Sequence, residues 1–298
     1  MLTATGSLEF CGAELKTRVM LTRAWRAHVM ARRKLLFDSD FAVPAKPRAG
    51  FVNLYLFLDG QVQLSGEAAA SAPLFVLFAD GEYEAASGDR RRLRTWGEPC
   101  SGIDWRLRRE HVLVPVGLEH GARPVPAAVV EALAAVVATT AEGSDRTQAV
   151  AAMDRLIAGL ASAGLVAPTL NVGRQALAAE LSRYAAVWRG LERLYARHET
   201  SPYLDLLSDL TGRSLRQLDR DFRALCDAFG LHGSSFRATV KVLRLRRAVL
   251  LLGAPSATPR QVAEAVGYGS VEALARAFRD AGLPPPSSVR EALTTPPA

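Results

Sequence analysis

The sequence predicts an α+β protein of more than one domain, with a β-rich N-terminal part, a helical connection and an all-helical C-terminal part. Three observations predict this. Short apolar runs separated by Gly- and Pro-containing turns fill residues 1–122. Beyond Pro124 the apolar spacing changes from the period of a strand to that of a helix. Near the C-terminus the pattern Leu-x-Arg-x-Phe occurs twice, as Leu218–Phe222 and Leu274–Phe278.

The composition supports a folded, basic protein. The chain has 298 residues, enough for two domains and a connection, and 49% of them are hydrophobic against 22% charged. The formal net charge is +7, and residues 196–298 hold 14 Lys and Arg against 10 Asp and Glu, a net +4. More than half of the basic excess therefore lies around the repeated pattern. Such a balance favours nucleic acid or another anionic surface as partner.

The cysteines and the apolar runs indicate the cellular compartment. Cys11, Cys100 and Cys226 are far apart and have no CxxC or Cys/His finger spacing, so we expect neither a disulfide framework nor a zinc finger. The N-terminal residues lack the basic start and the following apolar run of a signal peptide, so we expect none. The longest apolar stretch, Val125–Ala138, contains Glu131 and is too short to span a bilayer. We therefore expect a cytoplasmic protein that does not enter the membrane.

Strand signals follow one another in the N-terminal part. The apolar run Phe51–Leu58, the pair Asp59-Gly60 and the alternating Gln61–Leu64 predict a hairpin. A second one is predicted by Leu74–Phe78, Asp80-Gly81 and Glu82–Glu84. Further strands are expected at Arg92–Trp96, Ile103–Leu107 and His111–Val116. Six or more short strands at close spacing predict a small barrel or sandwich.

Helical spacing begins after Pro124. One helix carries the stripe Val129, Leu133, Val136, and a second runs over Asp145–Ala163. A third is expected from about Gly173 to His198. Its apolar positions alternate steps of four and three, the spacing of a helix-pair seam; they are Leu177, Leu181, Tyr184, Trp188, Leu191 and Tyr195. Because three heptads are short for a coiled coil, a core-facing helix is favoured over a dimer helix.

The C-terminal part is predicted to be helices joined by tight turns. The predicted helices are Ser201–Leu210, one capped by Ser214, the long basic Phe236–Leu252, one starting at Thr258-Pro259, Ser270–Arg279, and Ser287–Leu293. In both Leu-x-Arg-x-Phe copies the Leu and the Phe share a helix face while the Arg points elsewhere. Such a helix can bury Leu and Phe and present Arg to a DNA groove.

These residues resemble the AraC/XylS family of bacterial transcription regulators over about Leu177–Leu293. The second unit matches best, with Val262-Ala263, Gly267-Tyr268 and Leu274-x-Arg276-Ala277-Phe278 at the family spacing; Pro286, Arg290 and the long-helix residues Arg244-Leu245, Ala248 and Leu251-Leu252 match as well. The first unit departs from the pattern: Ser208 stands where the family has Ala, and Phe222–Arg244 is longer than usual. Gly282 is displaced by one position.

The resemblance implies a cupin-like β-barrel for sensing or dimerisation over residues 1–122, a helical linker over 123–175, and a DNA-binding domain of two helix-turn-helix units over 176–298. It implies DNA contacts at nine positions: Ser214, Arg216, Asp219, Arg220, Ser270, Val271, Glu272, Ala275 and Arg276. Asp219 either accepts from a cytosine amine or pairs with Arg216 and Arg220; pairing within the helix is favoured. Leu218, Phe222, Leu274 and Phe278 are assigned to the core.

The predicted function is sequence-specific DNA binding by a transcription regulator associated with the nucleoid. Double-stranded DNA is the expected partner; RNA polymerase, a small-molecule effector and a second copy of the chain are further partners that the resemblance implies. Two alternatives are a cupin-like metalloenzyme fused to a helical domain and a helical adaptor that does not bind DNA.

Several sequence features argue against an enzyme. His28, His111 and His120 lack the paired-His motif with a following Glu, and no nucleophile elbow, P-loop or dinucleotide motif occurs. We therefore expect no catalysis, no cofactor and no metal. The aromatic residues of the β-rich part are either core, which is favoured, or the lining of an effector pocket; they are Trp25, Tyr55, Phe57, Trp96 and Trp105.

Overall fold

The computed structural model describes residues 1–43, 50–65, 67–80, 92–170, 177–196, 208, 212–231 and 235–294. The strand expected at Glu82–Glu84 lies outside these residues. The same holds for the helix expected over Ser201–Leu210, apart from Ser208.

Nine antiparallel strands of the described chain form one sheet in the order β1-β2-β3-β8-β5-β7-β9, with β4 on β8 and β6 on β5. The strands are β1 (Leu2–Phe10), β2 (Ala13–Leu21), β3 (Trp25–Arg33), β4 (Phe37–Asp38), β5 (Phe51–Leu64), β6 (Ala70–Ser71), β7 (Leu74–Ala79), β8 (Leu93–Arg108) and β9 (Arg123–Pro124). The β-rich prediction is confirmed. The pairings form an open path from β1 to β9, and the cupin-like barrel stays a prediction.

Two strands are longer than predicted because each bends without turning back. The hairpin expected at Asp59-Gly60 is wrong: both halves of β5 pair with β8, and the register shifts between Phe57 and Gln61. The two strands expected at Arg92–Trp96 and Ile103–Leu107 are likewise parts of one strand, β8, which continues through Gly97 and Pro99. Gly60 has φ 104°, and a Cβ there would lie 2.7 Å from the carbonyl oxygen of Trp96. The glycine therefore permits a bulge between long strands in place of a hairpin.

The strand expected at His111–Val116 is also wrong. The chain leaves the sheet in the 3₁₀ turn η3 (Arg109–His111), where the Arg109 side chain donates to the carbonyl of Val112 at 2.7 Å. Val112 then forms only an isolated bridge with Val166. This segment therefore pairs with residues 165–167 and not with a strand of the sheet.

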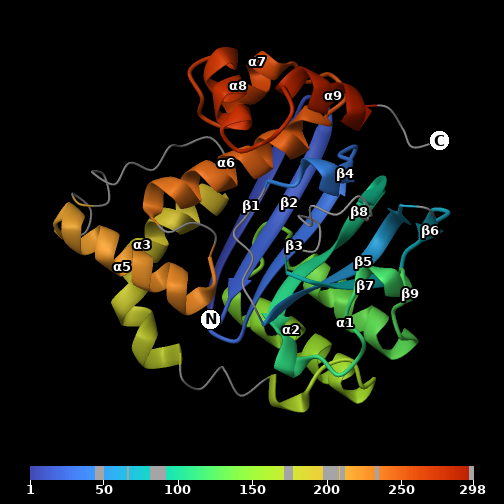
Figure 1. Cartoon of the computed structure of the whole chain (residues 1–298). Coiled ribbons are helices and arrows are strands. Elements are labelled where there is room, and N and C mark those ends of the chain that lie inside the picture. The colour runs from blue at the N-terminus through green and yellow to red at the C-terminus, as the bar shows by residue number, and fades with distance from the viewer. Residues whose placement is uncertain are drawn as a thin grey trace.

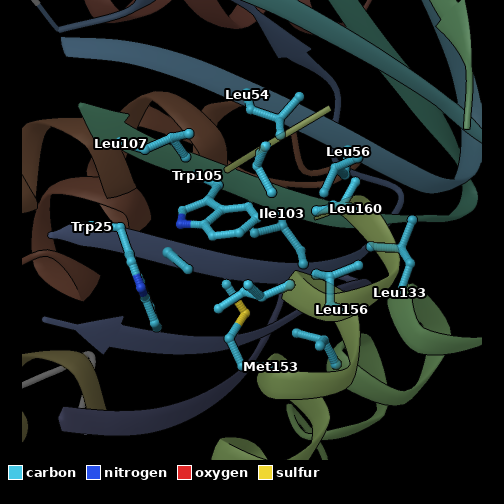
Figure 2. Packing of buried hydrophobic residues seen from close by; sticks show 14 of the residues in the cluster. Trp25, Leu54, Leu56, Ile103, Trp105, Leu107, Leu133, Met153, Leu156 and Leu160 are labelled. Atoms are coloured by element: carbon cyan, nitrogen blue, oxygen red, sulfur yellow. The ribbon is translucent and has the colours of Figure 1, made fainter. Parts of the chain in front are cut away.

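Helices α1 (Ala127–Ala138) and α2 (Arg146–Ser162) confirm the two helices predicted after Pro124 and cover one face of the sheet (Figure 1). Asp145 caps α2 in a capping box with Gln148. Between these helices and the sheet, Trp25 and Trp105 meet edge to face with ring centroids 5.9 Å apart (Figure 2). The core interpretation is confirmed for these two aromatics, and the predicted linker shares their core.

Six helices form the C-terminal part of the described chain: α3 (Leu177–Ala196), α5 (Leu215–Phe229), α6 (Phe236–Leu252), α7 (Pro259–Ala265), α8 (Val271–Arg279) and α9 (Pro286–Thr294). Their bounds agree closely with the predictions that fall on described residues. On α3, Tyr184, Trp188 and Leu191 are buried in a cluster with β1, β2 and α5. The seam is thus core-facing, as favoured, over its described part; the side chains of Leu177 and Leu181 lie outside the description.

The C-terminal helices pack on the sheet face opposite to α1 and α2. Along β2, Met20 points to the α2 side, while its neighbours Val19 and Leu21 join the cluster with α3, α5 and α6. A second cluster joins Leu15 and the segment after β3 to α6, α7, α8 and α9. The sheet is therefore the middle layer between two helical layers. No helix in the described part of the chain is long and apolar enough to cross a membrane.

Candidate nucleic-acid interface and cavity

Helix α5 carries the first Leu-x-Arg-x-Phe copy and is the first of the two helices predicted to read DNA, called reader helices below; it begins at a side-chain cap. Ser214 accepts a hydrogen bond from the backbone N–H of Gln217, whose side chain returns to Ser214 in a capping box. Leu218 and Phe222 are buried, at 1% and 0% exposure, which confirms their core assignment. Arg216 and Arg220 lie on the solvent side of the helix. The helix thus has a buried apolar stripe on one face and an exposed basic stripe on another.

The second reader helix, α8, repeats this design. Ser270 caps it by accepting from the backbone N–H of Ala273 at 3.2 Å. Leu274 and Phe278 are fully buried, whereas Arg276 is exposed. Val271 and Ala275 are half-buried and Glu272 is exposed.

Helices α7 and α8 lie where the sequence predicts the second helix-turn-helix unit. Thr258 caps α7 in a capping box with Pro259 in its first turn, as predicted. Gly267, with φ 81°, lies in the turn between the two helices. The first helix expected in the other unit lies outside the described residues, apart from Ser208.

Acidic residues affect the two reader helices differently. Asp219 pairs within α5 as favoured, but with Arg223, one turn further on, and not with Arg216 or Arg220. Asp221 pairs with Arg213 at 2.6 Å. On α8, hydrogen bonds from its own backbone N–H and from the Ser270 hydroxyl lower the pKa of Glu272, with help from Arg276. A carboxylate therefore occupies the N-terminus of α8, whereas Arg216 lies near that of α5.

The basic residues of α6 do not all face solvent. The Arg244 guanidinium lies 5.9 Å from the Tyr268 ring centre, so it braces the turn of the second unit. Arg246 points the other way, toward the sheet, and burial lowers its pKa. Burial also lowers the pKa of Arg247 to about 10. The sequence shows α6 as basic, but only the docking on the sheet distinguishes these arginines.

A cavity of about 140 Å³ lies between the sheet and α6, and one of about 80 Å³ adjoins it. His28, Met30, Asp104, Arg246 and Leu250 line both. The larger cavity has walls from β3, β4, β5, β8 and α6. Of the aromatic residues named in the sequence, Tyr55 and Phe57 line it and also pack in a hydrophobic cluster, so an effector pocket stays a prediction. Trp96 packs instead against the cluster formed with α6 to α9.

Ionisable groups gather at one end of this cavity. Burial raises the pKa of Asp104, and the charges of Arg26 and Arg246 oppose that rise. Oδ1 of Asp104 is buried without a hydrogen-bond partner in the described residues. The Tyr195 ring of α3 lies 6.4 Å from that of His28. This lining is not among the predictions from the sequence. Its signal in the sequence is the even-numbered side of β3, which carries Arg26, His28 and Arg32.

The three histidines occupy different surroundings. His28 lines the cavity, while His111 lies 3.8 Å from Glu110 in η3 and His120 lies 3.6 Å from Glu119 in η4 (Leu118–His120). Among the described residues, no group of three or more His, Cys, Asp or Glu side chains is arranged to hold a metal ion. None of the three cysteines forms a disulfide within the described residues.

Comparison with known proteins gives only distant structural likenesses. No protein family profile matches the chain, and no curated protein is similar in sequence. ToxT from Vibrio cholerae O395, bound to (E)-4-(8-methylnaphthalen-1-yl)but-3-enoic acid, has 10% identity and TM-score 0.36, over 91% of this chain and 100% of that chain. A further structure of ToxT from the same strain has 10% identity and TM-score 0.36 over 92% and 100%. The AraC-like transcriptional activator CuxR has 11% identity and TM-score 0.22 over 95% and 80%.

Proposed function

We propose that the protein is a sequence-specific DNA-binding transcription regulator of the AraC/XylS type, which reads two neighbouring major-groove segments with α5 and α8. The repeated reader helix carries this proposal. Arg220 and Arg276 are exposed at the same position of two capped helices, and in each the flanking Leu and Phe are buried. An exposed arginine of this kind suits the O6 and N7 atoms of guanine.

The spacer between the reader helices supports the proposal. Helix α6 has 17 residues, which corresponds to about 25 Å at 1.5 Å per residue. Leu245, Ala248 and Leu252 bury it among the helices of the second unit. A rigid rod of this length suits two readers held about one DNA turn, ~34 Å, apart. The predicted contacts then have different roles. Ser214 and Ser270 orient the helix N-termini. Arg216, Arg220 and Arg276 contact bases or phosphates.

The cavity between the sheet and α6 supports control by a small molecule. Arg246, Val249 and Leu250 of α6 form part of its wall. A molecule bound there contacts the sheet and the spacer at once. Its binding therefore biases the position of α6 relative to the N-terminal part, and with it the two reader helices.

The test is selection of bound sequences from random double-stranded DNA with the purified protein, followed by affinity titration of variants. We expect two half-sites about ten base pairs apart. Arg220→Ala and Arg276→Ala should each cost about 1–3 kcal/mol of binding free energy and relax the preference at one position. Arg155→Ala is the matched control, because Arg155 is exposed on α2 beyond the far face of the sheet. A folded protein that enriches no sequence contradicts the proposal.

A further inference from the structure

The two ends of the larger cavity offer opposite hydrogen-bonding groups. On paired strands β3 and β8, His28 faces Asp104, Met30 faces Gly102 and Arg32 faces Cys100. Asp104 and Arg32 are therefore separated by four residues along the strands, about 13 Å at ~3.3 Å per residue. Both line the cavity, so its floor runs from a carboxylate at one end to a guanidinium at the other.

One carboxylate oxygen of Asp104 receives no hydrogen bond in the described part of the chain. Oδ1 of Asp104 is buried and unbonded within the described residues, although Arg26 and Arg246 lie close enough to act on its charge. An unbonded buried acceptor is costly, and a ligand donor removes that cost. Because the charges of Arg26, Arg246 and Arg106 already act on Asp104, a further cation is disfavoured there. A neutral hydroxyl, which both donates and accepts, fits best.

One guanidinium nitrogen of Arg32 has no hydrogen-bond acceptor within the described residues. Nη2 of Arg32 donates to Thr95 Oγ1 at 2.7 Å and to Cys100 Sγ at 3.1 Å, while Nη1 is buried without a partner in the described part of the chain. The Phe37 ring flanks the guanidinium at 5.9 Å. A ligand carboxylate would supply the missing acceptor and the countercharge.

The middle of the cavity is apolar. Gly102 forms part of its lining, and the surrounding side chains are Met30, Phe41, Val43, Phe57, Ile103, Val249 and Leu250. A volume of about 140 Å³ is close to that of an engineered apolar cavity that holds a benzene ring. The lining therefore selects a single ring with short substituents.

We propose that this cavity binds a hydroxy-substituted aromatic carboxylic acid, with the hydroxyl on Asp104 and the carboxylate on Arg32. The inference rests on the proposed function only in treating the bound molecule as an effector. The binding site itself is defined by the polar groups at the two ends and the ring-sized space between them.

Isothermal titration of the full chain without DNA tests the proposal with three probes of one shape. They are 3-(4-hydroxyphenyl)propanoate, 3-phenylpropanoate without the hydroxyl, and 4-propylphenol without the carboxylate. The first should bind at least about tenfold more tightly than either of the others, because each missing group leaves a buried polar atom unpaired.

Variants assign each group to its end of the cavity. Asp104→Leu should abolish the advantage of the hydroxyl, and Arg32→Met that of the carboxylate. Arg33→Met is the matched control, since Arg33 is exposed on the same strand and does not line the cavity. Equal binding of all three probes by the wild-type protein, or no binding of the first, overturns the proposal even where a variant fails to fold.

Separate measurements keep this proposal apart from the proposed function. DNA affinity is titrated without probes, and probe affinity without DNA. Loss of sequence-specific DNA binding with retained probe discrimination contradicts the regulator and leaves the cavity assignment standing. The reverse outcome contradicts the cavity assignment alone.

Discussion

Arginine residues with similar sequence surroundings have opposite positions in this protein. Arg276 is exposed on α8, where the local pattern of buried Leu274 and Phe278 already fixes its direction. Arg246 sits in an equally helical pattern on α6 but faces the sheet, because the helix is covered on that side. The sequence predicts the first from spacing within one helix. It does not predict the second, which depends on strands more than a hundred residues away.

Asp104 makes stability depend on pH. Burial raises the pKa of Asp104 in the folded chain above the value of an unfolded Asp, about 3.9. Above the unfolded pKa the unfolded chain holds fewer protons than the folded one, so the free energy of unfolding falls as pH rises through the folded pKa. The side chain of the Asp104→Asn variant does not titrate, so its stability does not contain this pH-dependent contribution. The charged groups that act on Asp104 are Arg26, Arg246, Arg106 and Asp80.

Urea unfolding of the wild type and Asp104→Asn from pH 4 to pH 8 measures this effect. We expect the variant to gain stability relative to the wild type as pH rises, up to a plateau above the folded pKa. A difference that stays constant, or that shrinks with rising pH, would show that the arginines outweigh burial.

Single helices follow their local sequence, whereas strands depend on their partners. The caps Ser214, Thr258 and Ser270 lie where the sequence places them, because capping needs only residues three positions apart. Asp59-Gly60 has a good hairpin sequence too, yet it forms a bulge. The partner of β5 is the 16-residue strand β8, which pairs with both halves of β5. The residues around Asp59 do not indicate how long β8 is.

Helix α8 should lose its position when its buried Phe is removed. Phe278 is fully buried among α6, α7 and α9, so Phe278→Ala should destabilise the protein by about 3–5 kcal/mol and abolish DNA binding through unfolding of the second unit. Arg279→Ala, on the exposed side of the same helix, should change stability by no more than about 0.5 kcal/mol. Denaturant unfolding compares the two. Similar losses for both variants would refute the assignment of Phe278 to the core.

At the scale of the whole molecule, the sheet joins parts that the sequence presents as separate. The predicted division at residues 122 and 175 follows real changes in pattern, but α1 and α2 share a core with the strands, and α3 and α6 pack on the opposite face. The hydrophobic residues that make these contacts alternate along β2 as in any two-faced strand. This alternation predicts a strand face packed against a core; it does not identify the helices that cover either face of the sheet.

This layered arrangement predicts that the sheet and the helical part unfold together. Leu15 of β2 is buried in the cluster that includes α6, α7, α8 and α9, so Leu15→Asp would place an unpaired charge in that contact. Scanning calorimetry of the wild type should show one cooperative transition, and Leu15→Asp should split it as the helical part is released. Leu113→Asp is the control, because Leu113 is 57% exposed and should leave one transition. If Leu15→Asp also melts in one step, the two parts are coupled mainly through the α3 contact with β1, where Leu2 and Ala4 meet Trp188. The corresponding change there, Ala4→Asp, should then produce the split.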